Sequence, residues 1–156
     1  MIYTKRKIIR IIIIILILGL GLYVFYPRKV KTIIGGIPSG NPYTSCHVMI
    51  DRVVSGHLVP TDSFEIKDQN KIAKIYDFIA NHRVRKTFEL IDSGYRGEGD
   101  NYLIHFYSKA IGKDSIEFVG ISNSRYISLK SWTGKSKMYR FTPDEMDLKK
   151  LEELIK

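Results

Sequence analysis

The chain has a single cysteine, Cys46, among its 156 residues, so it cannot form an internal disulfide. The domain must therefore be stable through its hydrophobic core alone. Its four histidines do not show the close spacing of zinc ligands on a helix or in a finger. These absences argue against a disulfide scaffold and against a metal centre, and we expect no cofactor.

A complete phosphate-binding loop is also missing. The stretch 133–136 reads Thr-Gly-Lys-Ser, but the position that needs the first glycine of the motif holds Leu129. The glycine-rich segment 94–100 lies between predicted strands, whereas a phosphate cradle opens a helix. Its acidic residues do not have the spacing of a regular calcium loop. Nucleotide and calcium binding are therefore not predicted.

The basic charge of the chain is concentrated at its start. Residues 1–31 contain seven basic residues and no acidic one, which leaves 18 basic and 16 acidic residues in the rest of the chain. The net charge of +9 is thus largely juxtamembrane charge, which suits anionic lipid headgroups. The nearly balanced remainder does not indicate a nucleic-acid partner.

What the sequence has in abundance is a run of apolar residues, from Ile8 to Tyr26, interrupted only by Arg10. As a helix it would measure about 28 Å, close to the roughly 30 Å of a bilayer core. It predicts an N-terminal transmembrane signal-anchor helix over 8–26. A cleaved signal peptide is the alternative, because Lys5, Arg6 and Lys7 form a basic start and residues 1–26 could be removed.

This run divides the chain into four predicted parts. Residues 1–7 form a short basic cytoplasmic tail, 8–26 the anchor, 27–44 a stalk and 45–156 an extracytoplasmic domain. The stalk is predicted from the glycines and prolines of residues 35–42, which interrupt both helix and strand. The orientation follows the slightly greater basic charge before the run. The chain should therefore lie in the cell membrane as a single-pass protein.

The domain is predicted to be α+β, with an antiparallel sheet of about five strands and two helices on one face. Asp68 is a plausible helix N-cap, followed by a buried stripe of Ile72, Ile75, Tyr76 and Ile79. Alternating segments such as 102–107 and 126–129 then indicate a meander of short strands. The stretch 142–145, Thr-Pro-Asp-Glu, is typical of a capping box and predicts the start of a final helix.

Three residues are candidates for binding, and none is a candidate for catalysis on sequence grounds. Tyr95 and Arg96 lie in the glycine-rich loop, and Trp132 lies near a strand end beside Gly134. Aromatic residues and arginine often anchor protein interfaces. Without a binding role, each would be an ordinary loop or core residue.

The layout resembles small membrane-anchored extracytoplasmic proteins of unknown function from Gram-positive bacteria. The shared pattern is the basic-flanked anchor, a short stalk, the Ile72 and Ile75 helix leading into Thr87, and alternating strands such as 102–106. The resemblance implies a location at the cell membrane and a fold class, and it assigns no catalytic residue.

We therefore expect a membrane-tethered, non-catalytic binding module whose partners are the lipid bilayer and an unidentified protein. Two alternatives stay open. One is a small envelope-directed hydrolase that uses His105 or His57 with Asp100 or Asp51. The other is an accessory subunit of a membrane-protein complex, which contacts its partners through the anchor.

Overall fold

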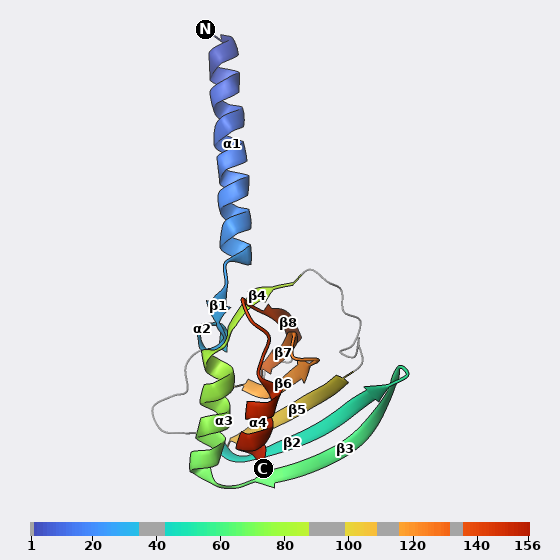
Figure 1. Cartoon of the computed structure of the whole chain (residues 1–156). Helices are drawn as coiled ribbons and strands as arrows, with labels where there is room; N and C mark the ends of the chain where they lie inside the picture. The colour runs from blue at the N-terminus through green and yellow to red at the C-terminus, as the bar shows by residue number, and fades with distance from the viewer. Residues whose placement is uncertain (1, 35–42, 88–98, 109–115, 132–135) are drawn as a thin grey trace.

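The structure is a computed structural model that describes residues 2–34, 43–87, 99–108, 116–131 and 136–156 (Figure 1). Its helices are α1 (Ile2–Phe25), α2 (Val30–Ile34), α3 (Gln69–Asn81) and α4 (Leu148–Ile155). Its strands are β1 (Arg28–Lys29), β2 (Tyr43–Val54), β3 (His57–Ile66), β4 (Arg83–Lys86), β5 (Gly99–Ser108), β6 (Ile116–Ser122), β7 (Tyr126–Ser131) and β8 (Ser136–Phe141).

The strands form one eight-stranded sheet in the order β1-β4-β8-β7-β6-β5-β2-β3, and all neighbouring strands are antiparallel. Figure 1 shows α3 and α4 on one side of this sheet and α1 projecting away from it. The expectation of about five strands and two helices is wrong, because the described residues contain eight strands and four helices.

Part of the undercount comes from β3, where Pro60 and Asp62 interrupt the alternation that identifies a strand. The structure places β3 at the outer edge of the sheet, where proline is tolerated because no further strand needs its N–H. The register shifts at Ile50, and Thr61 has no partner on β2. The Thr61 hydroxyl donates to the carbonyl of Ile50 at 2.8 Å, which satisfies that carbonyl at the bulge.

Two short elements lie within the segment predicted as the stalk. β1 pairs with β4, with Arg28 opposite Val84. Val30, the first residue of α2, is fully buried, and its N–H donates to the carbonyl of His82 at 2.8 Å. The chain that follows α1 is thereby joined to the domain, while residues 35–42 lie outside the described residues.

The predicted transmembrane helix is corrected by the structure. α1 covers the apolar run up to Phe25, yet no helix in the described part of the chain has the length and apolarity needed to cross a membrane. The helix begins within the basic segment, so Lys7 and Arg10 lie on α1 itself.

The helix α3 lies where the sequence spacing predicts it. The Asp68 carboxylate caps its start by accepting the N–H of Asn70 at 2.8 Å and of Lys71 at 3.2 Å. The apolar stripe of this helix faces the sheet and is buried, and its members are Ile72, Ile75, Tyr76 and Ile79.

The last helix begins later than the capping box predicts. Its N-cap is Asp147, whose carboxylate accepts the N–H of Lys150 at 3.1 Å. Thr142 extends the sheet instead, because its N–H donates to the carbonyl of Arg83 at 3.0 Å. Met146 is buried and its N–H donates to the carbonyl of Ser124 at 2.8 Å, so the segment before α4 is held against the sheet.

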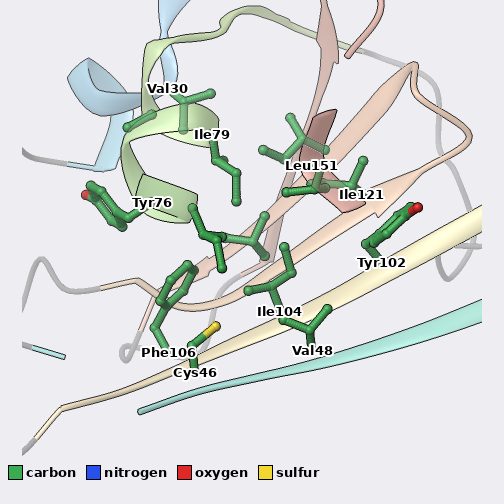
Figure 2. Close-up of a cluster of buried hydrophobic side chains, with 14 of the residues drawn as sticks. Val30, Cys46, Val48, Tyr76, Ile79, Tyr102, Ile104, Phe106, Ile121 and Leu151 are labelled. Atoms are coloured by element: carbon green, nitrogen blue, oxygen red, sulfur yellow. The ribbon is translucent and has the colours of Figure 1, made fainter. Parts of the chain in front are cut away.

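The core lies between the sheet and these helices. Figure 2 shows side chains from β2, β5 and β6, such as Val48, Ile104 and Ile121, pointing toward Ile79 of α3 and Leu151 of α4. Burying branched aliphatic side chains of this size contributes about 1.5–3 kcal/mol each. The face of the sheet that carries them is called the core face below.

Candidate interaction face

The three binding residues predicted from the sequence, Tyr95, Arg96 and Trp132, all lie outside the described residues. The candidate site lies on the face of the sheet opposite the core face, which we call the open face. No described helix covers it. On its central strands it consists of Asn101, Leu103, His105, Phe118, Gly120, Ser122, Tyr126, Ser128 and Met138.

The alternation of strand side chains produces this face. Tyr102 and Ile104 point into the core, so Leu103 and His105 must point to the other side of the sheet. Leu103 and Met138 are half-buried there, although in a two-layer fold an apolar side chain normally faces the core. The open face is therefore less polar than a sheet face that contacts only solvent.

Gly120 forms the floor of a hollow in the open face. It lies opposite Leu103 on β5 and opposite Ser128 on β7, and Ser128 lies opposite Met138 on β8. A methyl group at Gly120 would lie 3.3 Å from the ring of Phe118, so the ring occupies part of the space that the missing side chain leaves. Glycine within a strand often marks a place where another group approaches closely.

The hollow has a volume of about 90 Å³ and is lined mainly by Leu103, Phe118, Tyr126 and Met138. Small-molecule sites usually measure roughly 300–1,000 Å³. The hollow is thus too small for a cofactor, and it has room for one apolar side chain of a partner.

The polar groups beside the hollow already have partners. Asn101 is 2 % exposed, and its Oδ1 accepts the hydroxyl of Ser122 at 2.6 Å. The hydroxyls of Ser128 and Ser136 lie 2.7 Å apart in a second hydrogen bond. Among the described side chains, no buried nitrogen or oxygen lacks a partner, so no orphaned group here requires a polar ligand.

The groups proposed for a hydrolase do not come together. Asp100 lies on the side of the sheet that carries Tyr102, whereas His105 lies on the open face. Asp51 shares the face of His105 but lies four positions further along the register, roughly 13 Å away. His57 is exposed at the start of β3. The Asp100 carboxylate instead accepts the guanidinium of Arg52 at 2.7 Å.

Neither Cys46 nor Tyr102 can act as an acid or a base near neutral pH. Burial raises the pKa of the Cys46 thiol to about 12, which keeps it protonated and unreactive. Burial likewise raises the pKa of Tyr102 to about 12. Within the described residues, histidine, cysteine and carboxylate side chains do not gather in a group of three that could bind a metal.

Basic side chains border the open face on its β8 and β4 side. Arg140 lies opposite Tyr126 on one side and opposite Arg85 on the other, and both arginines are exposed. Like charges directly opposite each other on neighbouring strands repel. The Glu145 carboxylate lies close enough to Arg140 to interact with it electrostatically, and a carboxylate from a partner would reduce the repulsion further.

The sequence alone does not reveal the open face, because Phe118 and Tyr126 alternate along their strands as core aromatic residues do. The signal that marks the face is Gly120, a glycine between the apolar residues Val119 and Ile121 of β6. Comparison of the chain with family models, with curated proteins and with solved structures found no match. The resemblance to membrane-anchored extracytoplasmic proteins therefore stays a prediction.

Proposed function

We propose that this chain is a membrane-tethered binding module, which holds a partner protein on the open face of its sheet. The hollow over Gly120 is the observation that carries the proposal, because it is an apolar, partly exposed depression of the size of one side chain. Such depressions accept the anchor residues that supply most of the binding energy in protein interfaces.

The tether is α1. Its large apolar side chains are exposed along its length, and Ile15 is 62 % and Leu22 is 73 % exposed. Contiguous apolar surface of this extent marks contact with a membrane or a protein. We propose that lipid covers it, since Lys7 and Arg10 near its start suit anionic headgroups.

The side chains of the open face indicate which chemical groups a partner should present. An apolar side chain would enter the hollow between Leu103 and Met138. An acidic residue beside it would meet Arg85 and Arg140, which are exposed next to the hollow. The partner is therefore an apolar segment flanked by carboxylates.

The test is a charge placed in the hollow. We expect Leu103→Glu to lower the yield of the partner that co-purifies with the detergent-solubilised, full-length chain by at least about 30-fold, because it removes an anchor contact and buries a charge. The matched control is Leu58→Glu, which introduces the same charge at an exposed leucine of β3. Quantitative mass spectrometry of the purified complexes measures both.

Thermal unfolding checks that both variants fold as the wild type does. An unchanged partner yield for Leu103→Glu would contradict the proposal, and so would an equal loss for the two variants. A loss confined to Leu103→Glu supports it.

A further inference from the structure

A cavity of about 470 Å³ lies where the end of α1 meets the edge of the sheet. Tyr23 and Tyr26 line it from the end of α1, Arg28 from β1, Lys86 from β4, and Lys137 and Tyr139 from β8. Its volume falls within the range of small-molecule sites. It is separate from the hollow over Gly120, which is lined by other residues.

The charged side chains that line this cavity among the described residues have one sign. Arg28, Lys86 and Lys137 contribute three cations, and no acidic side chain of the described residues lines it. In the part of the chain that the structure describes, none of the three forms an ion pair with a carboxylate. Cations gathered without a counter-charge repel one another, so an anion bound between them would be favoured.

The cavity is the inner part of a basic edge. The three strands β1, β4 and β8 contain seven basic residues and no acidic one. The strand at the opposite edge, β3, contains Asp62 and Glu65 and no lysine or arginine. The near balance of charge over the whole domain conceals this separation.

The aromatic residues of the cavity provide both support and hydrogen bonds. The Arg28 guanidinium lies 4.5 Å from the ring centroid of Tyr23, and its Nη2 donates to the Tyr23 carbonyl at 3.3 Å. These contacts hold the guanidinium in place. Burial raises the pKa of Tyr139, so its hydroxyl stays protonated and can donate to an anion.

We propose that this cavity binds the phosphate of an anionic phospholipid headgroup, with Arg28, Lys86 and Lys137 as the cationic ligands. Arginine and lysine are the usual partners of phosphate in proteins. The lipid is favoured over a soluble phosphate because the cavity opens beside the exposed apolar side chains of α1, along which acyl chains can lie. The inference rests on the proposed tether and adds a lipid preference to it.

The experiment measures lipid selectivity of the full-length chain in phosphatidylcholine vesicles. Spin-labelled phosphatidylglycerol and phosphatidylcholine report, by electron paramagnetic resonance, which lipid is immobilised by the protein. We expect the wild type to prefer phosphatidylglycerol. The variant Lys86→Gln/Lys137→Gln should reduce this preference by up to about 25-fold, since each basic residue near a lipid surface contributes about a five-fold preference.

The matched control is Lys130→Gln/Lys149→Gln, which removes the same charge from two exposed lysines outside the cavity. We expect it to keep the wild-type preference. An equal reduction in both double variants would overturn the site, because net charge alone would then explain the selectivity. Loss of the preference when glycerol 3-phosphate is added in excess would overturn the choice of a lipid.

The same experiment distinguishes failure of the headgroup site from failure of the proposed tether. If the protein immobilises neither lipid, α1 is not in contact with lipid and the proposed tether fails. If it immobilises both lipids equally, the tether holds and the headgroup site fails. Circular dichroism confirms that each variant keeps the wild-type fold.

Discussion

The two faces of the same sheet differ in what lies against them. On the core face, Ile104 and Ile121 are almost completely buried beneath α3 and α4. On the open face, the neighbouring residues Leu103 and Phe118 remain partly exposed around Gly120. The strands alone do not determine this difference, since both faces carry apolar side chains. It follows from which face the helices cover.

The difference separates stability from binding. Side chains on the core face contribute to the free energy of unfolding, whereas those on the open face are available to a partner. Comparisons of residues on the two faces, and of residues that support the core face, test this separation.

The largest effect should come from shortening a core side chain. We expect Ile104→Ala to lower the free energy of unfolding by about 3 kcal/mol, because it leaves a cavity in the packed core. Leu103→Ala, one position away, should lower it by less than about 1 kcal/mol. Urea denaturation of both variants measures the difference, and similar losses would show that the open face is also packed.

Cysteine reactivity provides the second comparison. Cys46 is fully buried and its thiol has a raised pKa, so a thiol reagent should modify it only when the domain unfolds. In a Cys46→Ala background, Ser45→Cys places the thiol on the other side of β2. We expect the new thiol to react more than about 100-fold faster in the native protein. Equal rates would contradict the assignment of faces.

The third comparison concerns the helix that covers the core face. Asp68→Ala removes the cap of α3 and should lower the free energy of unfolding by about 1 kcal/mol. Asp77→Ala is the matched control, because Asp77 is an exposed residue within the same helix. A control variant as unstable as Asp68→Ala would mean that the cap is not the cause.

The smallest effect should be a change in how the stability of the fold depends on pH in the acidic range. Hydrogen bonds from Ser124 and Arg125 lower the pKa of Glu145 below its usual value. A lowered pKa in the folded state stabilises the fold above the unfolded pKa, and this stability is lost as pH falls through the folded pKa. The melting temperature should therefore fall less between pH 5 and pH 3 in Glu145→Gln than in the wild type.

The sequence predicts individual helices and their caps better than it predicts the number of strands in the sheet. The spacing of Ile72, Ile75 and Ile79 and the cap at Asp68 locate α3, because both signals are local. Pro60 conceals β3, which is possible as a strand only because it lies at an edge. The stretch at Thr142 has the residues of a capping box, but pairing with Arg83 and Ser124 draws the segment into the sheet. Such long-range contacts do not appear in local patterns.

The site was harder to predict because it depends on which face stays uncovered. Aromatic residues such as Phe118 and Tyr126 have the same alternation as core aromatics, and only the position of the helices distinguishes them. The basic edge was concealed for a related reason. Lys86 and Lys137 are distant in sequence, and the pairing of β4 with β8 brings their strands together.

Methionine oxidation tests the use of the open face most directly, because the chain has a methionine on each side of the sheet. Met138 lines the hollow, and Met146 is buried in the core. Peroxide should oxidise Met138 readily in the purified chain and several-fold more slowly in native membranes, where the partner covers it, while Met146 stays protected in both. Equal oxidation of Met138 in the two preparations would contradict the account.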